Sequence, residues 1–171
     1  MSKIFKIYLF LICILLLFCM GGCGGMPIFD DSEAKADTRL EKLLEVLAHK
    51  DDDALKKIFS KQALDDAVNF DKNSEYLFEL FQGNIVSWVR DSISGGTKIE
   101  YGKKSVQLRS WYTVTTDKEE YLFLVIDYIQ DTINPDNAGL YTLRVVRVED
   151  AEIQFSGYWQ DMEIAGIYRP E

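Results

Sequence analysis

Residues 104–131 constrain the fold more than any other stretch of the chain. Two runs rich in β-branched and aromatic residues flank a polar turn at Asp117 and Lys118, which predicts a long β-hairpin. Because successive side chains of a strand alternate between its faces, each residue can be assigned to one face. The first face collects Val106, Leu108, Ser110, Tyr112, Val114, Phe123, Val125, Asp127 and Ile129. The second face collects Gln107, Arg109, Trp111, Thr113, Leu122, Leu124, Ile126 and Tyr128. Neither face is wholly polar, so we expect both to be covered.

The first segment of the chain has the order of features that is typical of a secretory signal peptide. Lys3 and Lys6 supply positive charge, residues 7–18 form an unbroken apolar run, and small residues precede Cys23. The apolar run is shorter than the ~20 residues that a membrane-spanning helix prefers. Residues 20–23, Met-Gly-Gly-Cys, resemble a bacterial lipobox, in which the cysteine is lipidated and becomes the mature N-terminus. An uncleaved anchor and ordinary secretory cleavage are the alternatives.

These features divide the chain into three parts. We predict a lipoprotein signal peptide at residues 1–22, a lipidated Cys23 with a short linker at residues 23–30, and a single α+β domain at residues 31–171. Two acyl chains hold a protein at a bilayer where one chain is marginal. We therefore expect a lipid-anchored protein on the extracytoplasmic side of the cell membrane.

Charge and cysteine content exclude several function classes. The formal net charge of −9 argues against nucleic acid as a partner, because phosphates demand a basic surface. The three cysteines, Cys13, Cys19 and Cys23, all lie in the first segment. A disulfide framework, a zinc cluster and a cysteine nucleophile are therefore not expected in the domain.

We also expect no cofactor and no metal. The adjacent aspartates at residues 51–53 lack the alternating spacing of a calcium loop, and they suit the start of a helix instead. His49 is the only histidine, and its place at the end of a predicted helix favours a capping role over catalysis.

The apolar spacing changes from helical to alternating along the chain. Leu40, Leu43 and Leu47 mark a first helix, residues 51–53 begin a second, and a third stops at Gly83. Further on we expect a strand at 85–91, a turn at 94–96, a short strand at 99–101, the hairpin, a last long strand at 140–149 and an ordered tail at 166–170. Helices followed by strands predict an α+β fold, with amphipathic helices packed on a curved, cone-like antiparallel sheet.

Several short motifs carry a family resemblance over residues 31–171. They are Leu80-Phe81-Gln82-Gly83, Ser110-Trp111-Tyr112-Thr113-Val114, Asn134-Pro135-Asp136-Asn137, Gly139-Leu140-Tyr141-Thr142-Leu143 and Gly166-Ile167-Tyr168-Arg169-Pro170. The chain resembles a family of lipoproteins of unknown function from low-GC Gram-positive bacteria, within the nuclear transport factor two-like superfamily of cone folds. That resemblance implies a cone-shaped pocket between sheet and helices, which relatives use for catalysis, binding or dimerisation. It assigns no site residues.

The candidate site residues follow from the hairpin faces. Asp127 lies on an apolar face near Tyr112, and a carboxylate among apolar groups can serve as an acid or base. The alternative is that Asp127 is simply paired with a tyrosine hydroxyl, an arginine or the backbone. Trp88 and Arg144, with Tyr112 and Asp127, are candidates for ligand binding, although aromatic residues and arginines on strands more often serve packing.

Three function classes remain open. The first is a membrane-anchored lipoprotein whose domain binds a ligand or a protein without catalysis, and the second is a small-pocket enzyme of the isomerase or hydratase type using Asp127 and tyrosines. The third is a self-associating envelope protein. An apolar patch on the second hairpin face suggests a homodimer or protein partner there, unless the chain's own tail covers it; the patch is formed by Trp111, Leu122, Leu124, Ile126 and Tyr128.

Overall fold

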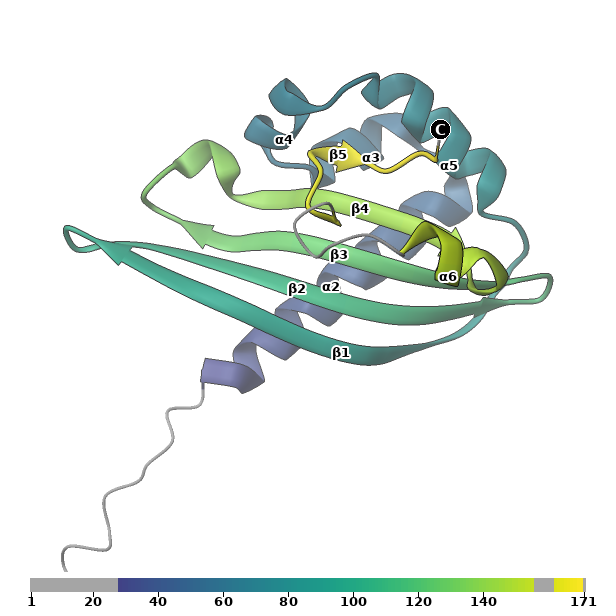
Figure 1. The fold of residues 1–171 in the computed structure, drawn as a ribbon, viewed down its shortest axis with the longest axis horizontal. Helices are drawn as coiled ribbons and strands as arrows, with labels where there is room; N and C mark the ends of the chain where they lie inside the picture. Colours follow the sequence, from purple (N-terminus) through teal and green to yellow (C-terminus); the bar gives the residue numbers. More distant parts are fainter. Residues whose placement is uncertain (1–27, 156–161, 171) are drawn as a thin grey trace, which may run out of the picture. The chain divides into compact units, whose positions relative to one another are not determined.

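The computed structural model describes residues 28–155 and 162–170. Helices come first in the chain and strands second, so the fold is α+β, as predicted (Figure 1). The helices are α2 (Ile28–His49), α3 (Asp52–Ile58), α4 (Lys61–Asp66), α5 (Phe70–Leu80) and the short α6 (Ala151–Gln154). The strands are β1 (Ile85–Glu100), β2 (Lys103–Thr116), β3 (Glu120–Asp131), β4 (Gly139–Arg147) and β5 (Gly166–Ile167).

The helices begin and end where local chemistry dictates. The Asp51 side chain caps α3 by accepting the backbone N–H of Ala54 at 2.9 Å, which confirms that the acidic residues 51–53 start a helix. Ser60 caps α4 in the same way, through the backbone N–H of Ala63. After α5 ends at Leu80, Gly83 adopts a positive φ of 91° and turns the chain towards β1.

The central hairpin has the predicted pairing from its turn as far as Gln107 and Tyr128, but a register shift beyond this point places Val106 opposite Gln130 instead of Ile129. Tyr112 faces Phe123 and Leu108 faces Asp127 across β2 and β3, and the turn lies between Thr116 and Glu120. We call the face that carries these side chains the inner face of the sheet. The face that carries the neighbouring pair of Trp111 and Leu124 is the outer face.

The sheet is mixed rather than purely antiparallel. Strands β1 to β4 are antiparallel neighbours, but β5 pairs parallel with β4, placing Gly166 beside Thr142. The backbone N–H of Tyr168 donates to the carbonyl of Leu143 at 2.9 Å and fixes this pairing. The prediction of an antiparallel sheet was wrong at this strand, because a tail that returns through a crossover pairs parallel, unlike one that returns through a tight turn.

The strand before the hairpin is also longer than predicted. Residues 94–96 form no turn, since Gly95 pairs with Leu108 within a continuous β1. The turn lies at Tyr101 and Gly102, whose φ values of 49° and 79° suit a tight hairpin. Gly95 serves close packing instead, because a Cβ there would lie 2.9 Å from the carbonyl oxygen of Gln107.

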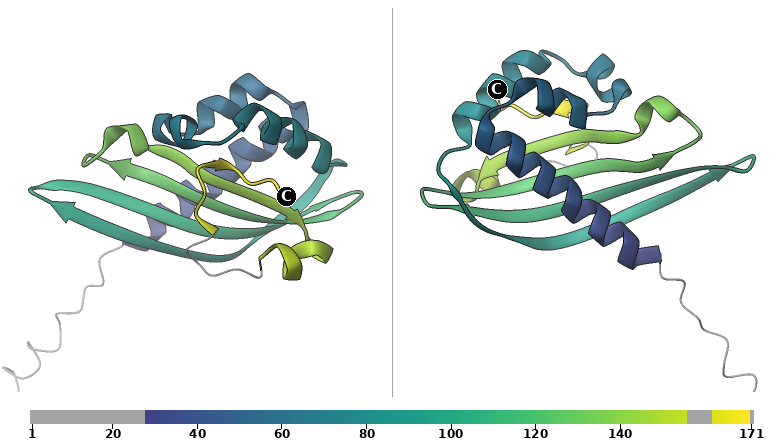
Figure 2. Two further views of the ribbon diagram at one scale, coloured as in Figure 1. Left: turned by 45° about the horizontal axis from the view of Figure 1, so that its top comes forward. Right: turned by 180° about the vertical axis from the view of Figure 1, so that it is seen from behind.

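The helix α2 runs obliquely across the inner face of the sheet (Figure 2). The main core lies between them, where inner-face side chains meet the apolar side of α2. Its fully buried members include Leu40, Leu43, Tyr112, Phe123 and Leu143. Side chains therefore fill much of the space between sheet and helix, where the family resemblance implied a cone-shaped pocket.

A smaller cluster covers part of the outer face. Leu124 and Ile126 are fully buried there against Met162, with Trp111 and Phe155 packed at the margin. The rings of Trp111 and Phe155 meet edge to face, with their centres 4.8 Å apart. The chain's own C-terminal part thus covers two of the apolar residues that the sequence analysis assigned to a partner surface.

Candidate functional site

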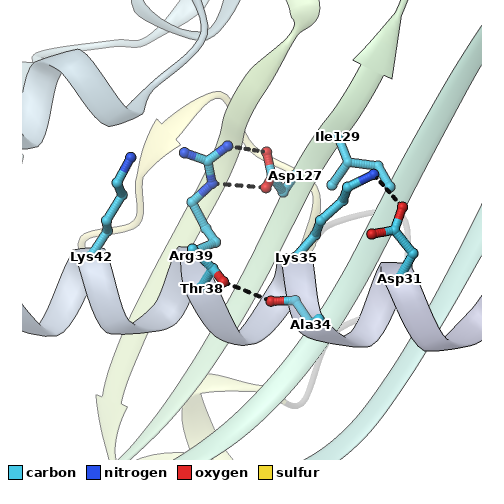
Figure 3. A pocket seen from close by; sticks show the side chains of 8 residues that line it. All are labelled: Asp31, Ala34, Lys35, Thr38, Arg39, Lys42, Asp127 and Ile129. Atoms are coloured by element: carbon cyan, nitrogen blue, oxygen red, sulfur yellow. Dashed lines mark hydrogen bonds and ion pairs between the residues drawn. The ribbon is translucent and has the colours of Figure 1, made fainter.

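Asp127 forms a two-point ion pair with Arg39 (Figure 3). The Arg39 Nε donates to Oδ2 at 2.8 Å and Nη2 donates to Oδ1 at 3.1 Å, so both carboxylate oxygens are engaged. Asp127 is only 3% exposed, whereas the side chain of Arg39 is 22% exposed. Such a forked contact gives geometric specificity as well as attraction. The carboxylate is therefore already paired with a side chain from α2.

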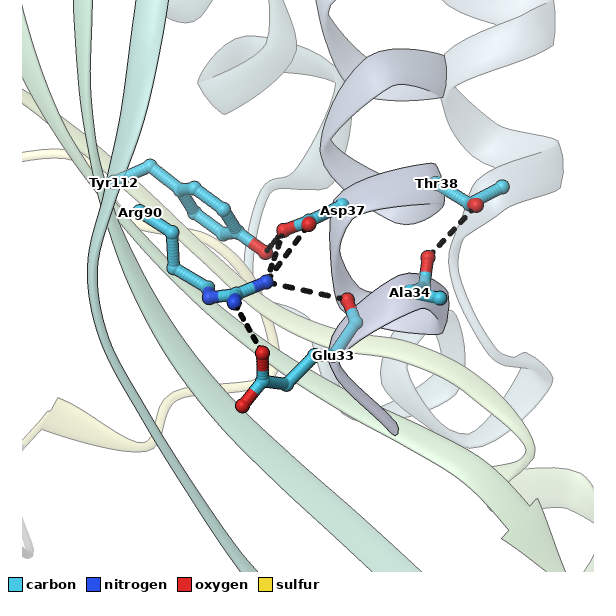
Figure 4. A network of polar contacts seen from close by, with 6 residues as sticks. All are labelled: Glu33, Ala34, Asp37, Thr38, Arg90 and Tyr112. Carbon is cyan, nitrogen blue, oxygen red and sulfur yellow. Dashed lines mark hydrogen bonds and ion pairs between the residues drawn. The ribbon is translucent and has the colours of Figure 1, made fainter. Parts of the chain in front are cut away.

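Tyr112 belongs to a different network (Figure 4). Its hydroxyl donates to Oδ1 of Asp37 at 3.2 Å, and the same carboxylate accepts both short contacts, at 2.8 and 2.7 Å, from Nη1 of Arg90. Nη2 of Arg90 donates in turn to the carboxylate of Glu33. Burial raises the pKa of Tyr112, and the Asp37 carboxylate raises it further, so the hydroxyl stays protonated and acts as a donor. These contacts join β1 and β2 to α2.

The four candidate residues do not form one site. Trp88 packs edge to face against Tyr112, with the ring centres 5.8 Å apart, so these two of the four candidates are in contact. Asp127 lies on the same inner face but is bonded to Arg39. No hydrogen bond joins Asp127 to Tyr112 within the described part of the chain.

Arg144 lies on the opposite face of the sheet. It is the cross-strand neighbour of Leu124, which places it on the outer face. Its guanidinium carbon is 3.5 Å from the ring centre of Tyr168 and 5.1 Å from that of Phe155. A cation between two aromatic rings is stabilised by their negative faces, so Arg144 holds the C-terminal part of the chain against the sheet.

Two hollows follow one side of α2 and meet at Arg39 and Lys42. The first, of about 390 Å³, lies between α2 and β3 and is lined by Asp31, Ala34, Lys35, Thr38, Arg39, Lys42, Asp127 and Ile129 (Figure 3). The second, of about 480 Å³, lies between α2 and α3 and is lined by Arg39, Lys42, Glu45, Val46, His49, Asp51, Ala54, Lys57 and Ile58. Residues spaced by three and four positions share a helix face, which explains why one helix lines both hollows.

His49 lines the second hollow at the C-terminal end of α2. Its Nδ1 lies 2.8 Å from the backbone carbonyl of Glu45, one turn earlier in α2. This local contact at the end of the helix matches the capping role that the sequence favoured.

The sequence analysis missed the three charged residues that decide these contacts. Asp37 and Arg39 are on α2, and Arg90 is on β1. For Asp37 and Arg39, the available signal was their position directly beside the apolar side of the helix, next to Ala36 and Leu40. Charged residues at such boundary positions can reach across to a neighbouring strand, but their partners cannot be read from spacing alone.

The described residues show no group of three or more histidine, cysteine, aspartate or glutamate side chains placed to hold a metal ion. Within the same residues, none of the helices combines the length and the apolar character that crossing a membrane requires. Cys23 and the predicted signal peptide lie outside the described residues.

The fold and its contacts define an α+β domain in which a charged helix is fixed across the inner face of a curved sheet. The family model described as a domain of unknown function, DUF5104, matches residues 42–148, and the chain belongs to this family. The match includes Lys42, Trp88, Tyr112, Asp127 and Arg144, and it starts after Arg39. A comparison with curated proteins finds no match.

Proposed function

We propose that this protein is a lipid-anchored extracytoplasmic lipoprotein whose domain binds a ligand or a protein partner and has no catalytic role. The observation that favours a non-catalytic role is the ion pair between Asp127 and Arg39. A carboxylate with both oxygens held by a guanidinium is poorly suited to accept or deliver a proton. The one acidic residue in the middle of the inner face thus serves to position α2.

The isomerase or hydratase alternative lacks the arrangement that it needs. Such an enzyme would combine a carboxylate and tyrosine hydroxyls around an open pocket. Here Tyr112 donates to Asp37 and Asp127 is paired with Arg39, and the hollow beside Asp127 is not lined by Tyr112. A ligand would therefore bind at the hollows along α2 rather than inside the sheet.

The family placement is part of the proposal. A helix-covered, curved sheet in an α+β domain supports membership of the nuclear transport factor two-like cone folds. Residues 20–23 support the lipoprotein assignment, because small residues precede Cys23 directly after the apolar run.

We also propose that a protein partner or a second copy of this chain binds at the outer face of the sheet. The surface for it is smaller than the sequence indicated, since Leu124 and Ile126 are already buried. Trp111 remains partly exposed at the margin of this cluster and is the residue through which such a partner would bind.

Metabolic labelling with a fatty acid tests the anchor. We expect label on the wild-type protein and its recovery in the membrane fraction, whereas Cys23→Ala should stay as unlabelled precursor. Cys19→Ala is the matched control, because bulky Phe18 precedes Cys19 and makes it a poor lipidation site, so this variant should be labelled normally. Normal labelling of Cys23→Ala would overturn the anchoring proposal.

A further inference from the structure

We propose that the junction of the two hollows along α2 is a binding site for a phosphate group, formed by Arg39 and Lys42 with Lys57 at its margin. This inference rests on the proposed binding function and names the chemistry of the ligand. Arg39 and Lys42 lie on α2 and Lys57 lies on α3, and the three side chains line the hollows.

Arg39 has donors to spare, and they are held in a fixed direction. Its bonds to Asp127 use Nε and one proton of Nη2, which leaves Nη1 free to donate to a ligand. Figure 3 shows this third nitrogen on the side of the guanidinium that faces Lys42. Because Asp127 is buried and engages two nitrogens, the plane of the guanidinium is set before any ligand arrives.

Lys42 and Lys57 supply positive charge that nothing in the described part of the chain neutralises. Neither ammonium group has a hydrogen bond or an ion pair there, although each is exposed beside the hollows. Lys35, in contrast, is already paired with Asp31 at 2.6 Å one turn earlier in α2.

Four carboxylates line the two hollows beside four cations, and three of these carboxylates are already engaged by other groups. Asp127 is balanced by Arg39, and Asp51 is engaged as the cap of α3. Glu45 is the remaining acidic side chain lining the hollows, and within the described residues no ion pair joins it to Lys42 or Lys57. The lining side chains carry no net formal charge, so the attraction for an anion comes from the free donors of Arg39, Lys42 and Lys57 rather than from a positive field.

Phosphate fits this donor set better than a single acceptor would. Arginine presents a planar fork to phosphate oxygens and lysine adds a mobile point charge, so an oxyanion with several oxygens can accept from both at once. A lipid headgroup and a soluble phosphate ester both carry this chemistry. The proposed anchor at Cys23 is close in sequence to α2, so both sources of the phosphate group are tested below.

Calorimetric titration of the full chain in a neutral detergent tests the site, with inorganic phosphate as the probe and ionic strength held constant with chloride. We expect saturable binding that weakens by about tenfold or more in Lys42→Gln, since one charge-assisted contact is lost. Lys118→Gln, an exposed lysine in the β2–β3 turn, makes the same charge change away from the junction and should bind like the wild type. Absence of binding, or equal binding by all three proteins, would overturn the site.

Two further probes separate the sources of the phosphate group. Tighter binding of dihexanoylphosphatidylglycerol than of glycerol 3-phosphate assigns the site to lipid headgroups, and the reverse order assigns it to soluble phosphate esters. Failure of both probes overturns the inference. Fatty-acid labelling of the same Lys42→Gln protein is a separate measurement of the anchor. If this variant is labelled normally but does not bind phosphate, only the phosphate site is affected and the anchoring proposal is retained.

Discussion

Asp127 and Arg39 join the middle of the sheet to α2 by two nearly parallel hydrogen bonds of 2.8 and 3.1 Å. A second contact, between Arg90 and Asp37, holds the same helix to the edge strand β1. The helix is therefore fixed to the sheet by the ion pairs of Arg39 and Arg90, in addition to the apolar core beneath it. The direction of Arg39, and with it the shape of the junction at Lys42, depends on the first pair.

Breaking the pair between Asp127 and Arg39 should destabilise the protein. Arg39→Gln leaves a buried carboxylate without a counter-charge, and we expect a loss of about 2–4 kcal/mol in the free energy of unfolding, slightly below the range for fully buried pairs. Asp127→Asn should cost less, because Arg39 can turn to solvent. Urea denaturation of both variants measures these losses.

The matched control for this pair is the double variant Arg39→Met with Asp127→Leu. Replacing both charges with apolar groups removes the desolvation cost, so most of the stability should return. If each single variant loses less than about 0.5 kcal/mol, the contact behaves like an exposed surface pair and does not fix α2.

The turn after β3 should give the protein an acid-sensitive contribution to stability. Burial alone would raise the pKa of Asp131, but hydrogen bonds from the backbone N–H of Asn134, from Ser105, from Asn137 and from the backbone N–H of Ile133 outweigh it and lower the pKa below 3.8. A carboxyl group with a lowered pKa in the folded state stabilises that state above its unfolded pKa. The contribution is lost as the pH falls through the folded pKa.

Asp131→Asn tests this contribution. The variant should be less stable than the wild type by a constant amount between about pH 5 and 8, and the difference should shrink below about pH 4. Asp136→Asn is the control in the same turn, since its exposed carboxylate is paired with the exposed Lys61. A difference that persists unchanged at low pH would mean that the charge of Asp131 is not what stabilises the turn.

The adjacent glycines of β1 should respond differently to alanine. A Cβ at Gly95 would lie 2.9 Å from both the carbonyl oxygen of Gln107 and Cδ2 of Leu108, whereas a Cβ at Gly96 would meet nothing within 4 Å. We expect Gly95→Ala to lose about 1–3 kcal/mol through overpacking. Gly96→Ala should be neutral or gain up to about 1 kcal/mol by restricting the unfolded chain. Thermal unfolding compares the two, and equal effects would contradict the close approach at Gly95.

The ring of Tyr168 should hold the C-terminal strand through Arg144. Tyr168→Leu removes the face that lies 3.5 Å from the guanidinium, a contact worth about 0.5–2 kcal/mol. Hydrogen exchange at the backbone amide of residue 168, which donates to Leu143, should then become faster. Tyr168→Phe keeps the ring and loses only the hydroxyl contact to Gln154, so its exchange should stay close to that of the wild type. Equal acceleration in both variants would show that the hydroxyl, and not the ring, holds the strand.

The sequence by itself determined the hairpin and its two faces. The alternation of apolar residues in β2 and β3, with a polar turn between them, places Leu108 opposite Asp127 and Tyr112 opposite Phe123. Strand alternation and helix caps depend on neighbours in the chain, and so the start of α3 at residues 51–53 was also predictable. Gly95 and Gly96 misled the prediction, because glycine suits a turn and a close strand pairing equally well.

The tertiary structure alone decided what Asp127 and Tyr112 do. Arg39 is 88 residues from Asp127 in sequence, and Asp37 is 75 residues from Tyr112, so no local pattern connects these pairs. The parallel direction of β5 and the position of Arg144 between two rings likewise depend on how the tail crosses the sheet. Periodicity specifies which face of a strand or helix a side chain occupies. Its hydrogen-bonding partner is decided only when packing brings that face against another element, because the crossing angle and the position along the element determine which side chains meet.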